Sequence, residues 1–228
     1  MIKLVVFDLD GTLADTLKDL GTAMNVALHG EDLLGYSMEE YRHLVGNGID
    51  RLVRDTMADA YTPEGAVRVK AAFQAYYADH CRDFTVAYNG IETLLDSLQA
   101  DGIATAVISN KPNQFVPEIL SALYPHHSFL GAWGQREEFP RKPSPESLEA
   151  LIAQSGYQKR DTLYVGDSNV DVMFAHNAGV KVCGVSWGFR GAAELREAGA
   201  DFVVNSAEEI YDLVNGEGRA KPSLIKKS

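Results

Sequence analysis

The sequence predicts an α/β fold: a doubly wound, mainly parallel sheet with a Rossmann-like core, into which a small α-helical cap is inserted. Two observations support this prediction. From about residue 90 onward, short apolar runs alternate with helical patterns, whereas residues 15–85 show helical periodicity alone. Alternating strands and helices are typical of a parallel sheet with helices on both faces. The helical block follows the first expected strand, which makes it a candidate cap or lid.

Five short runs of β-branched and apolar residues are expected to form the strands. Each run is continuously apolar, which is typical of strands buried on both faces of a parallel sheet. Open α/β sheets bind their ligands at the carboxyl ends of such strands. The runs are Lys3–Phe7, Ala104–Ile108, Thr162–Val165, Lys181–Val185 and Phe202–Val204.

Start and stop residues delimit the helices between these strands. Ser144 is expected as an N-cap with Pro145 at the first helical position, and Gly156 ends that helix. Ser206, with Glu209 three residues later, forms a capping box that opens the last helix. The helices expected in this part of the chain are Gly90–Ala100, Ser144–Ser155, Asn169–Ala178 and one that begins after Ser206.

Residues 15–85 carry several apolar stripes at helical spacing, which indicate helices packed on a core. Ser37 and Glu40 form a capping box ahead of one stripe, and Thr62 with Pro63 opens another. We therefore divide the chain into an α/β core, an α-helical cap and a flexible tail that has no hydrophobic face. The expected ranges are 1–14 and 86–215 for the core, 15–85 for the cap, and 216–228 for the tail.

The chain is acidic and poor in cysteine. Its 228 residues include 21 Lys and Arg against 32 Asp and Glu, a formal net charge of −11, and two cysteines. Nucleic acids and anionic membranes repel such a charge, and two cysteines cannot build a disulfide framework. The apolar run Leu4–Phe7 is too short for a signal peptide or a membrane span. We expect a cytoplasmic protein, a monomer or homodimer, with neither nucleic acid nor membrane as a partner.

Two groups of acidic residues follow expected strands. Asp8 and Asp10 end the first strand, and Asp167 and Asp171 follow the strand that ends at Val165. Alone, the first pair fits a simple turn and the second fits the capped start of a helix. Like charges this close, if buried, need a compensating cation or a shared proton, and oxygen ligands without His or Cys favour Mg²⁺. Together the two groups predict a magnesium site at one edge of the sheet.

Two further segments offer groups that bind phosphate. Ser109, Asn110 and Lys111 follow another expected strand and supply a hydroxyl, an amide and backbone N–H groups. Lys142 precedes a helix start and supplies the positive charge that an acidic site needs to hold a phosphoryl group. Alone, the first segment fits a strand-to-helix turn, and Lys142 fits a solvated surface charge. The order of all four elements along the chain makes the combination specific.

In this order, the four elements resemble the motifs of the haloacid dehalogenase-like hydrolase superfamily. The resemblance extends to about Val214, and the helical insert is similar to the small α-helical cap of that family. His176 departs from the family pattern, and helical spacing predicts that it faces away from the acids. The matching residues are Asp8-Leu9-Asp10-Gly11-Thr12, Ser109, Lys142, and Gly166-Asp167-Ser168 with Asp171.

The resemblance implies a role for each catalytic residue. Asp8 would be the nucleophile that forms an aspartyl-phosphate. Asp10 would protonate the leaving alcohol and then act as a base toward the hydrolytic water. Lys142 would pair with Asp8 and with the phosphoryl group.

The resemblance also implies the ligands of the metal and of the substrate. Mg²⁺ would be held by the carboxylates of Asp8 and Asp167 and by the backbone carbonyl of Asp10. Ser168 would support this coordination shell, and Asp171 would either support it or orient Lys142. The residues expected to bind the phosphoryl group or the rest of the substrate are Leu9, Thr12, Ser109, Asn110 and Lys142 in the core, and Gly48 and Arg51 in the cap.

Within the family, the segments Val45–Gly48 and Trp187–Arg190 are most similar to phosphoglycolate phosphatases. The role of Arg190 is left open. The expected activity is Mg²⁺-dependent hydrolysis of a small phosphorylated metabolite, a phosphomonoester similar to phosphoglycolate. A sugar phosphomutase similar to β-phosphoglucomutase and an inorganic pyrophosphatase of the same family remain alternatives.

Two readings outside this group fit the sequence less well. A dehalogenase would leave Asp10 and the metal-binding acids without a use. A phospho-acceptor signalling domain also combines an aspartate, Mg²⁺ and a lysine on an α/β fold. However, it places its acceptor on a later strand and has no helical insert, so the sequence favours the hydrolase.

Overall fold

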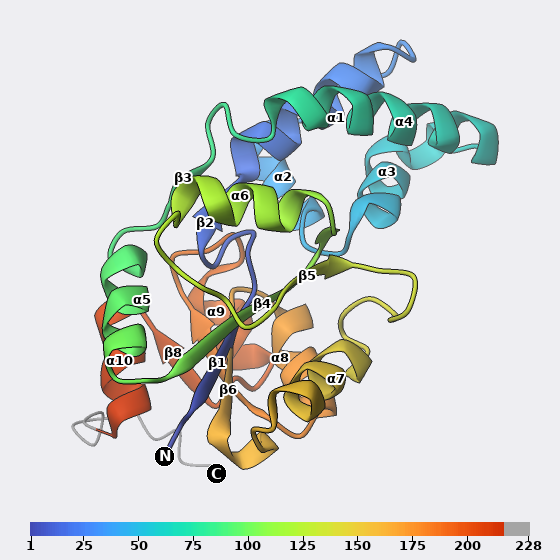
Figure 1. The fold of residues 1–228 in the computed structure, drawn as a ribbon. Coiled ribbons are helices and arrows are strands. Elements are labelled where there is room, and N and C mark those ends of the chain that lie inside the picture. Colours follow the sequence, from blue (N-terminus) through green and yellow to red (C-terminus); the bar gives the residue numbers. More distant parts are fainter. Residues whose placement is uncertain (217–228) are drawn as a thin grey trace.

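The structure is a computed structural model that describes residues 1–216, in which a six-stranded sheet with helices on both faces carries a helical layer at one end (Figure 1). The expected tail, 216–228, lies outside the described residues except for Gly216. Among the described residues, no helix is both long enough and apolar enough to cross a membrane.

All six strands of the main sheet run parallel, in the order β5-β4-β1-β6-β7-β8. The strand β1 (Leu4–Phe7) is fully buried between β4 and β6, as its continuous apolar pattern predicts. The predicted doubly wound α/β fold is thus confirmed. The other strands are β4 (Ala104–Pro112), β5 (Ala132–Gln135), β6 (Thr162–Gly166), β7 (Lys181–Val185) and β8 (Phe202–Val204).

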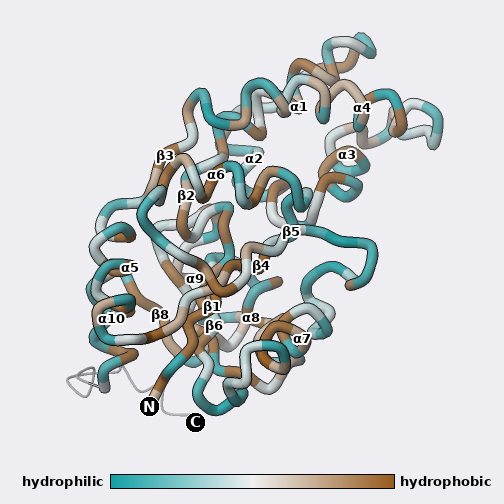
Figure 2. Tube along the Cα trace, viewed as in Figure 1, coloured by the Kyte–Doolittle hydropathy of each residue, from teal (hydrophilic) through white to brown (hydrophobic). Residues whose placement is uncertain are grey.

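Alternate residues of β1 point to opposite faces of the sheet and join two separate hydrophobic clusters. Val5 and Phe7 pack in the larger cluster, and Leu4 and Val6 pack in the smaller one. Figure 2 shows hydrophobic segments along these central strands and a hydrophilic loop between β5 and the next helix. The larger cluster includes helices α5 (Ile91–Ala100), α6 (Phe115–Leu123) and α10 (Ala207–Asn215); the smaller one includes α7 (Glu146–Ser155), α8 (Asn169–Asn177) and α9 (Gly191–Glu197).

Four helices form the layer at the carboxyl end of the sheet, which we call the cap (top of Figure 1). The predicted Ser37–Glu40 capping box and the Thr62 N-cap are both present. The chain enters and leaves the cap through a small antiparallel pair, β2 (Ala14–Asp15) and β3 (Val86–Ala87). The cap helices are α1 (Leu17–His29), α2 (Met38–Leu44), α3 (Ile49–Met57) and α4 (Pro63–His80).

Several elements differ from the sequence-based expectation. β4 continues four residues beyond Ile108, so the polar residues expected after the strand lie within it. The helix expected from Ser144 begins at Glu146, with Pro145 as the N-cap residue. Ser206 caps α10, but the Glu209 carboxylate accepts from the backbone N–H of Asn205 and not from that of Ser206. The capping box is therefore incomplete. β5, α6 and α9 were not predicted.

Candidate active site

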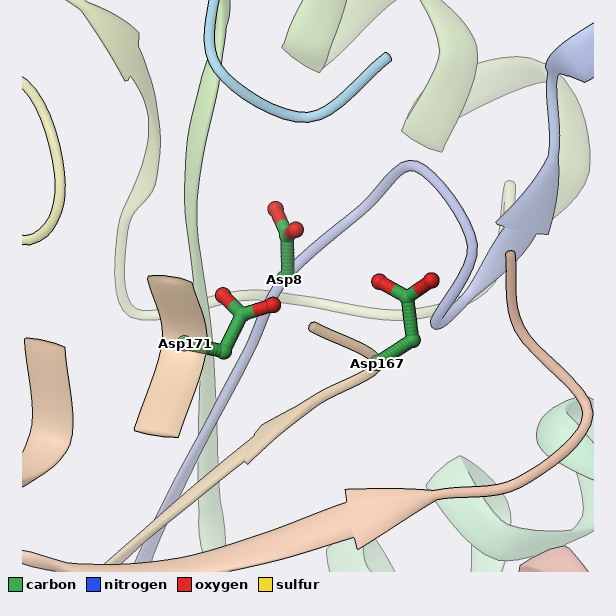
Figure 3. A group of neighbouring side chains, drawn as sticks. All are labelled: Asp8, Asp167 and Asp171. Carbon is green, nitrogen blue, oxygen red and sulfur yellow. The ribbon is translucent and has the colours of Figure 1, made fainter. Parts of the chain in front are cut away.

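The carboxyl ends of β1 and β6 lie side by side and bring three aspartates together. Asp8 follows β1, Asp167 follows β6, and Asp171 lies in the first turn of α8. One carboxylate oxygen from each residue lies within 4.8 Å of the others, and Figure 3 shows the three side chains gathered at the end of β1. All three are buried. The sheet therefore builds the acidic cluster that the strand-end pattern predicts.

A buried lysine lies between two of these aspartates. Lys142 Nζ is 3.1 Å from Asp8 Oδ1 and 2.7 Å from Asp171 Oδ1. It also hydrogen-bonds the hydroxyl of Tyr164 at 3.0 Å. Burial alone would lower the pKa of Lys142, but the negative charges of Asp171 and Asp8 outweigh burial and raise it. The lysine is therefore a permanent cation beside Asp8.

One lysine does not balance three buried carboxylates. Burial, with a smaller contribution from the charge of Asp171, raises the pKa of Asp8 to about 6 against the attraction of Lys142. Burial and the charge of Asp171 also raise the pKa of Asp167 well above its usual value. Such shifts identify carboxylates that lack sufficient compensating positive charge.

Asp167 sits in a tight backbone cradle. The N–H of Phe189 donates to Asp167 Oδ2 at 2.7 Å. A Cβ on Gly11 would lie 2.3 Å from Asp167 Oδ2, and a Cβ on Gly188 would lie 2.2 Å from Asp167 Cβ, so only glycine fits at either position. The site thus offers hard oxygen donors, excess negative charge and no room for another side chain. These properties fit Mg²⁺.

Asp171 belongs to the acidic cluster by distance, but the chain already satisfies both of its carboxylate oxygens. Oδ1 accepts from Lys142 and from the hydroxyl of Tyr164 at 3.1 Å. Oδ2 accepts from the N–H of Ser168 at 3.1 Å and from its hydroxyl at 2.6 Å. A carboxylate whose oxygens already accept these hydrogen bonds is a poor metal ligand, although it lies close to the other two. Asp8 and Asp167 are therefore the candidate metal ligands. Asp171 is held by Lys142 and Ser168 and is not one of them.

The fourth aspartate, Asp10, contacts different partners. Its Oδ1 accepts from the Thr16 hydroxyl at 2.7 Å and from Lys111 Nζ at 2.9 Å. Lys111 also donates to the hydroxyl of Tyr77, from α4 of the cap, at 2.7 Å. Sequence reasoning included Lys111 only in a segment that supplies backbone N–H groups, gave its side chain no role, and interpreted the Tyr77 stripe as packing. The available signal was a lysine at the end of a buried strand, directly after two candidate phosphate-binding residues.

Ser109 and Asn110 are buried in the extended part of β4. The side-chain amide of Asn110 donates to Gly46 O in the cap at 3.1 Å. Its Oδ1 accepts from the N–H of Lys142 at 2.9 Å. Asn110 therefore joins three segments around the acidic cluster.

Two expected phosphate-binding residues lie in the turn after β1. The N–H of Leu9 donates to Asp8 Oδ1 at 2.7 Å, so it helps to orient that carboxylate. The Thr12 hydroxyl is buried and has no hydrogen-bond partner among the described residues. The Thr12 carbonyl accepts from the indole N–H of Trp187 at 3.1 Å, which ties this turn to the segment after β7.

An open cavity lies between the sheet and the cap; its empty space, which is continuous with the solvent, is about 480 Å³. Gly48 lines the cavity, but Arg51 does not: its side chain is 62% exposed and pairs with Asp55 at 2.6 Å. The lining residues of the core are Asp8, Asp10, Ser109, Asn110, Lys111 and Pro112. Those of the cap are Leu20, Val45, Gly46, Gly48, Ile49, Leu52, Phe73 and Tyr77.

Two residues whose roles the sequence left open have defined positions. Arg190, at the start of α9, donates from Nη2 to Val45 O at 3.0 Å and so links the core to the cap. His176 lies on the outer side of α8, 3.3 Å from Asp201, and faces away from the acidic cluster as helical spacing predicts.

Comparison with known proteins agrees with this geometry. The family model described as haloacid dehalogenase-like hydrolase matches residues 5–185. A phosphoglycolate phosphatase of Vibrio parahaemolyticus is 31% identical over 220 residues, which cover 93% of this chain and 96% of that protein. A phosphoglycolate phosphatase of Pseudomonas fluorescens is 33% identical over 214 residues, which cover 91% of this chain and 78% of that protein.

Solved structures share the fold. A protein of Lactobacillus delbrueckii subsp. bulgaricus superimposes with a TM-score of 0.88 at 30% identity, covering 93% of this chain and 98% of that one. CbbY of Rhodobacter sphaeroides, solved in complex with phosphate, superimposes with a TM-score of 0.74 at 26% identity, covering 92% and 96%. With the matched motifs and these relatives along nearly its whole length, the chain belongs to the haloacid dehalogenase-like hydrolase family.

Proposed function

We propose that this protein is a Mg²⁺-dependent phosphatase that hydrolyses a small phosphomonoester of the phosphoglycolate type through an aspartyl-phosphate. The observation that carries the proposal is the buried Asp8 carboxylate, 3.1 Å from Lys142, at the wall of the open cavity between the sheet and the cap. The phosphoglycolate phosphatases among its relatives support the substrate class.

In the first step, a carboxylate oxygen of Asp8 attacks phosphorus, and the bond between phosphorus and the ester oxygen breaks. Asp10 gives its proton to that oxygen, so the alcohol leaves uncharged. In the second step, a water molecule attacks the phosphorus of the aspartyl-phosphate, and Asp10 takes a proton from it. Inorganic phosphate leaves, and both carboxyl groups return to their starting states.

The positive charges of the site counter the repulsion between a carboxylate and a phosphate dianion. Asp8, Asp167 and the backbone carbonyl of Asp10 would hold Mg²⁺, whose chemistry is to neutralise charge on the phosphoryl oxygens. Lys142 supplies a second, fixed positive charge between Asp8 and Asp171. Stabilisation by such preorganised charges is commonly the largest catalytic contribution.

The phosphoryl oxygens need donors once Asp8 has reacted. Ser109, Asn110 and Lys142 line or adjoin the cavity beside Asp8, and the Leu9 N–H and the Thr12 hydroxyl lie in the turn that follows it. We assign these groups to phosphate binding. Gly48 belongs to the cap loop that faces them, whereas Arg51 would need a different side-chain conformer to reach the cavity.

We assign residues 15–85 to a cap that excludes water from the reacting groups and selects the leaving alcohol. The apolar cap residues Leu20, Leu52 and Phe73 form the opposite wall of the cavity. A cytoplasmic location and a monomeric or homodimeric state are part of the same proposal.

The test is phosphate release from a panel of small phosphomonoesters, sugar phosphates and pyrophosphate, with Mg²⁺ or with excess chelator. The proposal expects release from a phosphomonoester such as 2-phosphoglycolate and at least 100-fold less release with chelator. Full activity in chelator would overturn the metal assignment. Conversion of a sugar phosphate to its isomer, without free phosphate, would favour the phosphomutase.

A further inference from the structure

Lys111 is a second buried lysine in this site, and the proposed phosphatase chemistry does not use it. It lies in the extended part of β4, and its side chain is 1% exposed. Its Nζ donates to Asp10 Oδ1 at 2.9 Å and to the Tyr77 hydroxyl at 2.7 Å. The lysine thus joins the proposed general acid to the cap at the wall of the cavity.

The donors at this place are not all used. A lysine ammonium carries three N–H donors, and the described residues accept two of those of Lys111. The Tyr77 oxygen accepts from Lys111, so its own proton remains free to donate. Two donors, one of them charged, are therefore available side by side at the cavity wall.

No other cation lines the cavity. Among the described lining residues, Lys111 is the only lysine or arginine. Lys142 lies behind Asp8, and Arg51 pairs with Asp55 on the outside of the cap. The cap wall consists of apolar side chains and glycines apart from Tyr77. An anionic group on the substrate, other than its phosphate, has one favourable place in the cavity.

We propose that Lys111 Nζ and the Tyr77 hydroxyl bind a carboxylate on the leaving-group side of the substrate and so select phosphomonoesters that carry one. The proposal rests on the proposed phosphatase function and deepens it. Lys111 supplies charge and Tyr77 supplies a directed hydrogen bond, and an alkyl group in place of the carboxylate would satisfy neither. Because Lys111 has three donors, it holds the substrate carboxylate without releasing Asp10.

The test compares two substrates that differ only in the carboxylate, 2-phosphoglycolate and ethyl phosphate. Hydrogen bonds to charged groups are worth about 1.5–3 kcal/mol, so the wild-type kcat/KM should favour 2-phosphoglycolate by about 10- to 100-fold. In Lys111→Met this preference should fall to below about threefold. Lys111→Arg should keep most of it, because the charge remains. Tyr77→Phe, which loses one hydroxyl from a packed ring, should reduce it by about three- to tenfold.

Lys159→Met is the matched control, because Lys159 is half exposed and pairs only with Glu149 among the described residues; it should keep the wild-type preference. Lys111→Met also removes a partner of Asp10, so both substrates should slow. Equal slowing of both, with the preference unchanged, would overturn the proposal and make Lys111 a positioning residue. A wild-type preference near one would also overturn it. If Lys111→Met does not fold, Tyr77→Phe decides.

A binding measurement separates this proposal from the phosphatase proposal. 3-Phosphonopropionate and propylphosphonate mimic the two substrates with a C–P bond that an aspartate cannot cleave. Calorimetry with Mg²⁺ should show tighter binding of 3-phosphonopropionate by about 10- to 100-fold in the wild type but not in Lys111→Met. If the protein hydrolyses no ester but keeps this preference, the phosphatase proposal fails and the carboxylate site stands.

Discussion

The two walls of the cavity are built on different principles. The core wall consists of buried carboxylates, Lys111 and polar groups on the ends of parallel strands, with Lys142 and Asp171 behind it. Short hydrogen bonds join Lys111 to Asp10 and Lys142 to Asp171. The cap wall, among the residues that the structure describes, consists of apolar side chains and glycine backbone, with Tyr77 as its single polar side chain. The core wall is therefore suited to bond-breaking chemistry, and the cap wall to selection by shape.

The difference also appears in stability. Burying the aspartates of the core wall opposes folding, as the raised pKa values of Asp8 and Asp167 show. The cap wall gains stability from apolar burial, because its side chains continue the larger hydrophobic cluster. If this contrast holds, substitutions in the core wall should change chemistry most, and substitutions at the cap should change it less.

Asp8→Asn gives the largest expected effect. An amide is a poor nucleophile, so kcat should fall by roughly 10⁴-fold or more, and no phosphoenzyme should be trapped on rapid quenching. The protein should remain folded, because the neutral amide removes one buried charge. Phosphate release is measured beside Asp96→Asn, an exposed acid on α5. Turnover of Asp8→Asn near the wild-type rate would refute the assignment.

Lys142→Met tests whether the charge of Lys142 is needed for the stability of the buried aspartates and for activity. Without it, Asp8 and Asp171 lose their common cation. Removing one partner of a buried ion pair costs about 3–5 kcal/mol of unfolding free energy, and activity should fall by roughly 10²- to 10³-fold. Urea unfolding in chelator measures the first effect and phosphate release the second. Stability equal to that of the wild type would break the contrast between the two walls.

The pH dependence of the metal-free protein sharpens the same contrast. The pKa of Asp8 is about 6 in the folded protein and near 3.8 when unfolded. Between about pH 4 and 6, the Asp8 carboxyl is protonated in the folded protein and ionised in the unfolded chain. The free energy of unfolding should therefore fall by about 3 kcal/mol as the pH rises through this range. Urea unfolding in chelator should show this loss in the wild type and a flatter profile in Asp8→Asn. Identical profiles would contradict it.

Arg190→Met gives the smallest expected effect, because it touches only the junction of the two walls. The variant loses the hydrogen bond to Val45 O, which holds the end of α2 against the core. We expect kcat/KM to fall by about three- to tenfold, with thermal unfolding changed little. Arg68→Met, at an exposed pair with Glu31 on the cap, is the control. A loss as large as that of Lys142→Met would place Arg190 in the chemistry itself.

The sequence predicted the parts of the molecule that local patterns determine. Continuous apolar runs identified β1 and β7, and the carboxylates after β1 and β6 met because parallel strands end at one edge. β5 was missed because it is a half-buried edge strand with neither a continuous nor an alternating apolar pattern. Local periodicity was thus sufficient for the centre of the sheet and insufficient for its border.

Contacts between distant segments account for the rest. Lys111 meets Asp10 across 101 positions of sequence and Tyr77 across 34. No local pattern shows that a lysine on β4 faces a cap tyrosine rather than solvent. The same holds for Arg51 and Arg190: both looked equally free in the sequence, but only Arg190 lies at the junction of cap and core.

The glycines that surround Asp167 have a consequence for the variation this protein tolerates. Gly11 and Gly188 carry no functional group, yet a single methyl on Gly188 would lie 2.5 Å from the Gly11 carbonyl oxygen and collide with Asp167. A survey of random substitutions would therefore score these two positions as severely as the aspartates. Positions that tolerate no substitution would therefore include glycines that leave room for Asp167 as well as the residues that carry functional groups.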